Sequence, residues 1–349
     1  MFRWPILYRS CWRGDSNKEK PHAPRHSLDS ALVRDYIRAS EEKANMSANG
    51  SLHKIRIGPA GWSYPDWEGI VYPAHKRRDF HRASYLAHFF DTIEINTTFY
   101  HPATPETVKD WIRRIDHNPE FKFTAKLWQR FTHERSADRK DEKIFKDCLA
   151  PLMSAGRLGA LLLQFPWSFK NAKESREYLG GLIMQFMEYP LVVEVRHSSW
   201  NTPEIFQLLE KLGVGFCNID QPVIGSSMGA TQRATSPVGY VRLHGRNYDQ
   251  WFTARDHGEE RYNYYYSRPE LEPWVERIDA VAERTDETYV ISNNHFQGKA
   301  VANGLQLESM ISGAPVRVPE TLLARYPELA EIRAPEPATA PVGESGLLF

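Results

Sequence analysis

Ionisable side chains occur at every second position in three short, otherwise apolar runs of this 349-residue chain. Successive side chains of a β-strand point to opposite faces, so the alternate polar residues of each run share one face. A charge in a dry layer beneath helices is unfavourable unless it is paired, so we expect these polar faces to point away from the helices. The residues are Glu94 and Asn96 in residues 93–98, Glu194 and Arg196 in residues 191–197, and Arg242, His244 and Arg246 in and just after residues 239–245.

Polar residues also stand at the ends of the remaining apolar runs, namely Lys126, Gln164, Asp220, Asn293 and Asn294. Carboxyl and imidazole groups transfer protons, which makes Glu194 and His244 the first candidates for acid/base catalysis. Glu94 and Asp220 are the second-ranked candidates. Guanidinium and ammonium groups bind carboxylate and phosphate, which favours a small anionic or sugar-like ligand. The predicted substrate-binding residues are Lys126, Arg196, Arg242 and Arg246, with the amides Asn96, Gln164, Asn293 and Asn294.

Aromatic residues follow several of the same runs. The candidates for substrate contact are Trp62, Tyr64, Tyr100 and Trp200, and the long segment 246–269 contains Trp251 and six more aromatic residues. Aromatic walls suit a sugar ring or another flat ligand. The alternative is that these rings only cover the end of the fold.

The elements that position these residues alternate between strand and helix. Apolar or β-branched runs occupy residues 55–58, 93–98, 121–126, 159–165, 191–197, 215–220, 239–245 and 288–293. Helical patterns occupy residues 79–90, 104–118, 138–155, 174–188, 202–212, 270–284 and 299–311. Such alternation predicts a parallel sheet, and eight units in about 260 residues fit a closed β/α barrel of the TIM type. Residues 221–238 show no helical pattern, so we expect the barrel to lack its sixth helix. We expect the polar residues to line a deep cavity at the carboxyl ends of the strands, with the aromatic residues at its rim.

Composition narrows the classes of protein. Lys plus Arg and Asp plus Glu both number 44, so the formal net charge is zero and offers no support for a duplex-binding protein. The three cysteines lie far apart, which favours a reducing compartment, and we expect a cytoplasmic protein. No apolar stretch is long enough to span a membrane. We found no cofactor-binding motif and expect no cofactor; the Gly-rich turn of a dinucleotide-binding sheet is absent after the first strand.

The two ends of the chain differ from its centre. Residues 1–53 are rich in basic residues and carry one amphipathic segment, and we expect them to be poorly structured or partly helical and dispensable for folding. We place the barrel at residues 54–312, a segment packed on it at residues 313–333, and a disordered tail rich in Pro and Ala at residues 334–349.

Seven segments, in order along residues 55–311, resemble the YecE-like family, a domain of unknown function (number 72). They are IRIGPAGWSYPDWEGIVYP at 55–73, FFDTIEINTTFYHPATPETVKDW at 89–111, FKFTAKLWQRFTH at 121–133, LGALLLQFPWSF at 158–169, VVEVRHSSW at 192–200, YVRLHGR at 240–246 and NNHFQGKAVANGLQL at 293–307. The resemblance implies a β/α barrel, in agreement with the strand count. It implies no reaction, because the activity of the family is not established.

Several functions therefore stay open. The first is an enzyme that uses acid/base chemistry on an anionic or polyhydroxylated substrate, as a hydrolase, lyase or isomerase. The second is a binding module without turnover, for a nucleotide or single-stranded nucleic acid held by aromatic and Arg side chains. A third is a metal-dependent isomerase-like or endonuclease-like barrel, with Glu94, Glu194, Asp220 and His244 as ligands. The non-functional alternative is a structural ion network in which Glu94 and Glu194 pair with Arg196 and Arg242.

Overall fold

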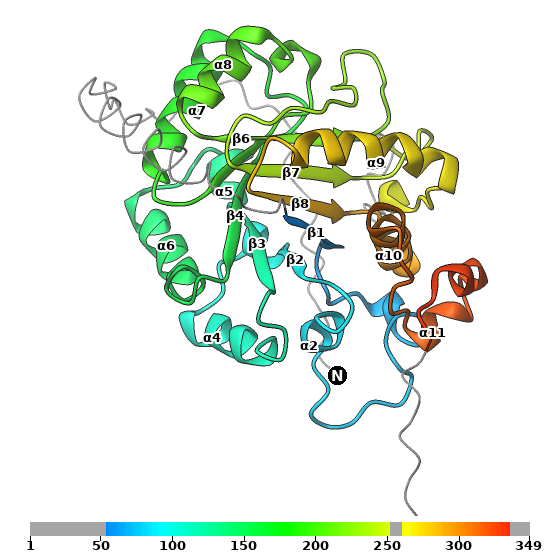
Figure 1. The fold of residues 1–349 in the computed structure, drawn as a ribbon. Helices are drawn as coiled ribbons and strands as arrows, with labels where there is room; N and C mark the ends of the chain where they lie inside the picture. The colour runs from blue at the N-terminus through cyan, green and yellow to red at the C-terminus, as the bar shows by residue number, and fades with distance from the viewer. Residues whose placement is uncertain (1–53, 252–259, 336–349) are drawn as a thin grey trace, which may run out of the picture.

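Eight parallel strands form one sheet in a computed structural model, which describes residues 54–251 and 260–335. The strand order is β1-β8-β7-β6-β5-β4-β3-β2, and the longer helices surround the strands (Figure 1). The predicted TIM-type barrel is therefore confirmed. The strands are β1 (Lys54–Pro59), β2 (Thr92–Ile95), β3 (Lys122–Lys126), β4 (Leu158–Gln164), β5 (Leu191–Glu194), β6 (Gly215–Asp220), β7 (Val238–Leu243) and β8 (Glu287–Ser292).

The helices of the described residues lie close to their predicted positions. The α-helices are α2 (Arg82–Leu86), α3 (Thr97–Tyr100), α4 (Pro105–Arg114), α5 (Gln129–Thr132), α6 (Arg139–Ser154), α7 (Lys173–Gln185), α8 (Pro203–Lys211), α9 (Arg268–Ala282), α10 (Lys299–Ser312) and α11 (Glu320–Leu323). Short 3-10 turns are η1 (Pro65–Trp67), η2 (Ser198–Trp200), η3 (Glu260–Tyr262), η4 (Phe296–Gly298) and η5 (Pro327–Ile332). Local sequence explains several starts: Pro105 and Pro203 stand at first helical positions, and Asp138 and Asp141 form a reciprocal cap on α6.

The first and second strands meet at glycines. The backbone N–H of Gly61 donates to the carbonyl of Glu94 at 2.8 Å, and Ala60 forms a parallel bridge with Glu94. A Cβ atom on Gly58 would lie 1.9 Å from the carbonyl oxygen of Thr92. Only glycine therefore allows β1 and β2 to approach closely enough to bring the ends of the sheet together.

No helix joins β6 to β7, as the sequence predicted; this connection lies wholly within the described residues. The connecting segment packs against the end of β5 instead. The N–H of Met228 donates to the carbonyl of Arg196 at 2.7 Å, and the N–H of Ser198 donates to the carbonyl of Ser226 at 2.8 Å. The segment thus fixes the backbone that follows Glu194.

The strands β2 and β5 each end three residues earlier than predicted. β2 ends at Ile95, because the chain turns into α3 and the Thr98 hydroxyl donates to the carbonyls of Ile95 and Lys126. β5 ends at Glu194 and pairs with β6 through only two registered residue pairs. Asn96 and Arg196 therefore lie just beyond their strands rather than within them.

The chain after α10 packs on the outside of the barrel. Leu322, Tyr326 and Leu329 belong to the main hydrophobic core, and the N–H of Ala334 donates to the carbonyl of Val316 at 2.8 Å. In the part of the chain that the structure describes, no helix is long and apolar enough to cross a membrane. The expectations for residues 1–53 and for most of the tail fall outside the described residues.

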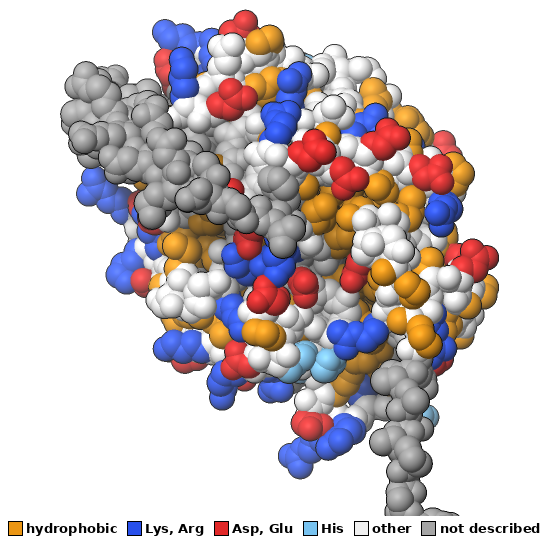
Figure 2. Space-filling model, viewed as in Figure 1, with side chains coloured by type: hydrophobic (Ala, Val, Ile, Leu, Met, Phe, Trp, Pro, Cys, Tyr) orange, Lys and Arg blue, Asp and Glu red, His pale blue; other side chains and the backbone are white. Residues whose placement is uncertain are grey.

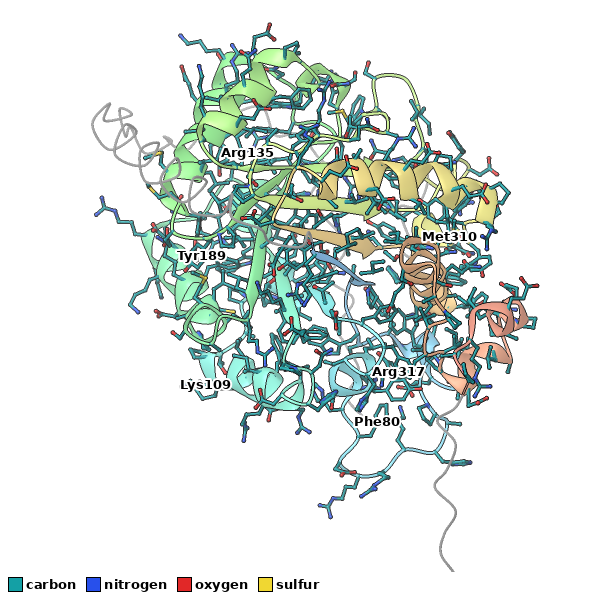
Figure 3. The ribbon with its side chains drawn as sticks, in the orientation of Figure 1. Phe80, Lys109, Arg135, Tyr189, Met310 and Arg317 are labelled. Atoms are coloured by element: carbon teal, nitrogen blue, oxygen red, sulfur yellow. The ribbon has the colours of Figure 1, made fainter. Side chains whose placement is uncertain are left out.

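Acidic and basic side chains are interspersed over the face in Figure 2, in keeping with the zero net charge. A surface groove of about 780 Å³ lies between α4 and α6 on the outside of the barrel. Its lining includes the exposed Lys109, which is carried by α4 (Figure 3). A smaller one lies where the start of α9 meets α10 and η5. Neither is lined by the polar residues predicted to face the barrel interior.

Candidate functional site

A fully buried guanidinium joins two carboxylates inside the barrel. Arg242 on β7 donates to Glu194 on β5 at 2.6 Å and to Glu94 on β2 at 2.7 Å. All three side chains are at most 1% exposed. The period-two argument from sequence predicted this convergence, and the structure has it. An ion triad that bridges three strands fixes their inner faces relative to one another.

Arg196 and His244 extend this triad toward the carboxyl ends of the strands. The Nε of Arg196 donates to Glu194 at 2.9 Å, and His244 Nε2 lies 3.4 Å from the same carboxylate oxygen. The other ring nitrogen of His244 lies 2.9 Å from the side-chain amide of Asn293. Arg196 keeps part of its surface open to solvent, whereas His244 is buried. The two residues therefore connect the buried triad to the open end of the barrel.

The protonation states of this cluster follow from burial and charge. Burial alone would raise the pKa of Glu194, but attraction to Arg242 and then Arg196 overcomes it and holds that pKa well below the usual range. Burial, together with the nearby Arg196, lowers the pKa of His244 to about 3. At neutral pH Glu194 is thus a carboxylate and His244 a neutral imidazole. Glu194 serves as an anchor for cations rather than as a proton donor.

Three residues beneath the triad were missed by the sequence analysis. The Tyr240 hydroxyl lies 3.0 Å from Glu94 and 2.8 Å from the hydroxyl of Thr124, and Cys217 Sγ lies 3.9 Å from Glu194. Tyr240 has the same strand phase as Arg242, so the alternation could have identified it had tyrosine been counted as polar.

Gln164, which the sequence did predict, is paired in register with Glu194, which places it on the same inner face, and its amide donates to the Phe165 carbonyl at 3.0 Å.

Lys126 ends β3 on the inner face. Its Nζ lies 4.3 Å from the centre of the Phe99 ring, a cation–π contact. Within the described residues its ammonium has no ion pair and no hydrogen bond, although the side chain is only partly exposed. Burial, and then repulsion from Arg242, lowers the pKa of Lys126 to about 8 despite attraction from Glu94 and Glu194. This lysine is therefore the group of the site that titrates nearest to neutral pH.

His133 also contacts Phe99, in an edge-on arrangement with 4.9 Å between ring centres. Burial, and then repulsion from Lys126 and Arg196, lowers the pKa of His133 to about 3. Its ring is thus neutral at physiological pH. Sequence reasoning passed over His133 because it lies on no strand and carries no spacing signal.

A wall of rings borders the same end of the barrel. Tyr64 stacks on His295 with ring centres 4.3 Å apart, and Tyr262 lies 5.2 Å from His295. The Tyr64 hydroxyl accepts from Asn96 at 3.3 Å, while Asn96 Oδ1 and His295 Nδ1 are buried without a hydrogen-bond partner among the described residues. Tyr100 is exposed beside Phe99. Unsatisfied buried acceptors beside a ring wall are features that a bound hydroxyl-bearing ligand would complete.

Trp251 covers part of this end. Its ring is buried and lies 5.9 Å from the guanidinium carbon of Arg196 and 6.3 Å from the ring of His244. The deep cavity that the sequence predicts at this end stays a prediction. The partly exposed groups at this end are Tyr64, Asn96, Lys126, His133 and Arg196.

Asp220 and Arg246 do not join this cluster. Asp220 is paired in register with Leu243, whose side chain packs in the outer apolar layer, so both point away from the barrel interior. Gly245 then turns the chain with φ +88°, which carries Arg246 out of the phase of Arg242 and His244. Arg246 instead binds both oxygens of Asp220, and the Tyr266 hydroxyl donates to the same carboxylate. The predicted roles of Asp220 in catalysis and Arg246 in substrate binding therefore lack the expected placement.

Three further residues that the sequence predicted to bind substrate instead pack against neighbouring elements. The amide of Asn294 donates to the side chain of Asn303 on α10 at 2.8 Å. Trp62 packs edge-on against Trp111 of α4, with ring centres 5.2 Å apart. Trp200 is fully buried, stacks on Phe169 and donates its indole N–H to the Phe169 carbonyl at 2.7 Å. Each finds its partners in the outer layer rather than at the inner cluster.

The four residues suggested as metal ligands also lie apart from one another or are already paired. Glu94 and Glu194 hold Arg242 between them, and Asp220 lies on the opposite face of the sheet. Within residues 54–251 and 260–335, no three His, Cys, Asp or Glu side chains converge as metal ligands would. The four residues suggested by the sequence therefore do not form one ligand set.

The geometry defines a β/α barrel whose inner face carries a charged cluster at the carboxyl ends of the strands, the end at which barrel enzymes place their reacting groups. Comparison with known proteins gives its family. The model of the family described as "Protein of unknown function DUF72" matches residues 56–326, and the chain belongs to this family. The resemblance drawn from the sequence motifs is thereby confirmed.

The chain is similar to UPF0759 protein YunF of Bacillus subtilis (strain 168), with 30% identity over 272 residues that cover 74% of this chain and 94% of YunF. It is also similar to the crystal structure of a DUF72 family protein from Thermotoga maritima MSB8, with 34% identity, a TM-score of 0.66, and coverage of 74% of this chain and 100% of that one. A DUF72 family structure from Enterococcus faecalis V583, 24% identical with a TM-score of 0.65 over 74% of this chain and 95% of that one, supports the fold alone.

Proposed function

We propose that this protein is an enzyme that binds a small anionic substrate at the carboxyl end of the barrel and acts on it by acid/base chemistry. The observation that carries the proposal is that, among the described residues at this end of the barrel interior, cations outnumber carboxylates. Arg242, Arg196 and Lys126 face Glu94 and Glu194, while both nearby histidines are neutral. A carboxylate or phosphate group on the substrate would balance this charge.

Lys126 and Arg196 are the two cations that an incoming anion could reach, because both are partly exposed whereas Arg242 is buried. Neutral His244 would donate or accept a hydrogen bond at the reacting group, and Asn293 and Glu194 hold its ring in place. A neutral imidazole can polarise a carbonyl or relay a proton without adding charge. The ring wall of Tyr64 and His295 would contact the carbon skeleton of the substrate.

Thermal shift against a panel of phosphorylated and carboxylated compounds tests the proposal. A ligand at 100 times its Kd adds about 2.7 kcal/mol to the free energy of unfolding. Arg196→Gln, which keeps a hydrogen-bond donor near Glu194, should weaken anion binding at least tenfold. The matched control is Arg77→Gln, since the side chain of Arg77 is 89% exposed. Absence of any stabilising anion, or equal binding by both variants, contradicts the proposal.

The same assay separates this proposal from a nucleic-acid binding module. A protein that contacts several phosphates loses affinity steeply as salt rises. A site for one small anion should lose only a little affinity between 50 and 200 mM salt, a range over which phosphate-backbone binders weaken by orders of magnitude. Tight, steeply salt-dependent binding of a single-stranded oligonucleotide, with no response to small anions, would favour the binding module.

A further inference from the structure

Two lysines on the inner face of β3 have contrasting surroundings. Lys122, at the start of the strand, places its ammonium 2.7 Å from both carboxylate oxygens of Glu287. Lys126, two positions further along the same face, contacts the Phe99 ring and has no carboxylate partner among the described residues. Ion pairing keeps a lysine protonated, whereas an apolar surface and neighbouring cations favour the free amine. Only the second environment suits a lysine that reacts.

The neighbours of Lys126 favour a nucleophilic amine. Burial and Arg242 lower its pKa to about 8, so about a tenth of the lysine is the free amine at pH 7. Desolvation and an adjacent cation are the two devices that activate amines toward carbonyl compounds. Phe99 holds the stem from one side, and Thr98 anchors the backbone of Lys126 with a hydrogen bond of 2.8 Å to its carbonyl. These contacts hold the amine in place at the carboxyl end of the barrel.

The groups around the amine match an anionic carbonyl compound. Arg196 is partly exposed and close enough to Lys126 to lower its pKa, so it can hold the anion while the carbonyl carbon meets the amine. Neutral His133 contacts the same Phe99 ring as Lys126. Neutral His244 lies 3.5 Å from the Arg196 guanidinium. These imidazoles can exchange protons with water at the reacting oxygen without repelling the anion.

We infer that Lys126 is the catalytic amine of the site and forms an imine with a small oxo acid or phosphorylated aldehyde or ketone; the inference rests on the proposed function. The amine nitrogen attacks the carbonyl carbon, a C–N bond forms, and the carbonyl π electrons move to oxygen, which takes up a proton while nitrogen loses one. The C–O bond then breaks with uptake of a second proton, water leaves, and nitrogen loses its remaining proton as the C=N bond forms. No oxidant or reductant is needed. Once its nitrogen takes up a proton, the imine withdraws electrons from the neighbouring carbon, as a lyase or isomerase requires.

Reductive trapping tests this inference. Pyruvate and glyceraldehyde 3-phosphate serve as separate probes, each incubated with the full chain and cyanoborohydride, and adducts are located by peptide mass spectrometry. We expect one dominant adduct, on Lys126, whose rate of formation rises with a midpoint near pH 8. Lys126→Met should remove it, while the matched control Lys109→Met, an exposed lysine of α4, should keep it. Lys126→Arg keeps the positive charge and removes the amine, so it covers the case in which the Met variant fails to fold.

The outcomes separate the two proposals. Adducts spread over surface lysines, or unchanged in both Lys126 variants, overturn the imine. If phosphate still stabilises the wild type and Arg196→Gln weakens that effect, anion binding stands and only the imine is lost. If neither phosphate nor either probe stabilises the protein, the proposed function fails as well. A Lys126 adduct suppressed by inorganic phosphate supports both.

Discussion

Charged side chains inside the barrel are paired differently at its two ends. At the amino ends of the strands, Arg56 lies 3.0 Å and Lys122 2.7 Å from Glu287, and the Tyr289 hydroxyl donates to the same carboxylate at 2.7 Å. At the carboxyl ends, Arg242 and Arg196 pair with Glu94 and Glu194, and Lys126 has no carboxylate partner in the described residues.

This difference separates a structural network from a candidate site. Burial would raise the pKa of Glu287, but hydrogen bonds from Lys122, Tyr289 and Arg56 overcome it and lower that pKa to about 2. Each cation of the lower network thus contacts the carboxylate of Glu287. The upper network differs because one of its cations, Lys126, contacts no carboxylate among the described residues and has a lowered pKa. In β/α barrels the amino end serves stability and the carboxyl end serves chemistry, and the charge pattern follows that division.

The largest expected effect comes from breaking the upper triad. Arg242→Met leaves Glu94 without its ion pair in a fully buried position, and such a loss destabilises a protein by about 3–5 kcal/mol. Arg56→Met should cost less, because Glu287 keeps Lys122 and is partly exposed. Denaturant unfolding at pH 7 measures both free energies, and the triple variant Arg242→Met, Glu94→Gln, Glu194→Gln should recover part of the loss. Equal losses for the two single variants would contradict the comparison.

The next effect contrasts the two lysines of β3. Lys122→Met removes a paired cation and should lower stability by roughly 1–3 kcal/mol, whereas Lys126→Met removes an unpaired one and should leave stability unchanged or higher. Thermal and denaturant unfolding of both variants at pH 7 is the measurement. A larger loss for Lys126→Met would show that this ammonium stabilises the fold.

The pH dependence of Lys126 follows with a definite sign. Its pKa in the folded state, about 8, lies below the unfolded value of about 10.4, so the unfolded chain holds more protons between those values. The penalty for its charge is complete below pH 8 and disappears as the pH rises. The free energy of unfolding of the wild type should therefore rise by roughly 1–3 kcal/mol relative to that of Lys126→Met between pH 7.5 and 10. The lower part of this range applies because the ammonium is partly exposed and solvent screens its charge. A difference in unfolding free energy that does not change with pH would mean that the pKa of Lys126 is not lowered.

His244 should give a smaller effect at acid pH. Its pKa is about 3 in the folded state and about 6.5 when unfolded, so the unfolded chain takes up the extra proton as the pH falls below 6.5. Stability attributable to the neutral ring is then lost, by roughly 1–2 kcal/mol at pH 5. His244→Gln should be less acid-sensitive than the wild type over this range while also losing response to the anion. Unchanged acid sensitivity would show that the ring is protonated in the fold.

The fold and the inner triad could be predicted from sequence because polar and apolar residues alternate in β2, β5 and β7. This alternation reveals which face of each strand packs under the helices. β6 could not be interpreted this way: Phe216, Cys217 and Ile219 are apolar on both faces, so the direction of Asp220 depended on its register with Leu243. Arg246 was misplaced because Gly245 breaks the alternation. His133 and His295 lie in connections between elements, where only the folded chain brings them to the strand ends.

The smallest expected effect tests the boundary between the inner and outer faces at this same end of the barrel. Asp220 is buried, but its partner Arg246 is partly exposed and also lies 3.6 Å from Glu270, so Asp220→Asn leaves no isolated buried charge. The Tyr266 hydroxyl keeps an acceptor in the new amide. We expect a loss of about 1 kcal/mol in unfolding free energy and no more than a twofold change in anion affinity. Arg196→Gln, a matched loss of one charge on the inner face, should instead reduce anion affinity at least tenfold. If Asp220→Asn abolished anion binding while stability held, the substrate would have to reach both sides of β6, and the division between a structural outer network and a functional inner one would be wrong.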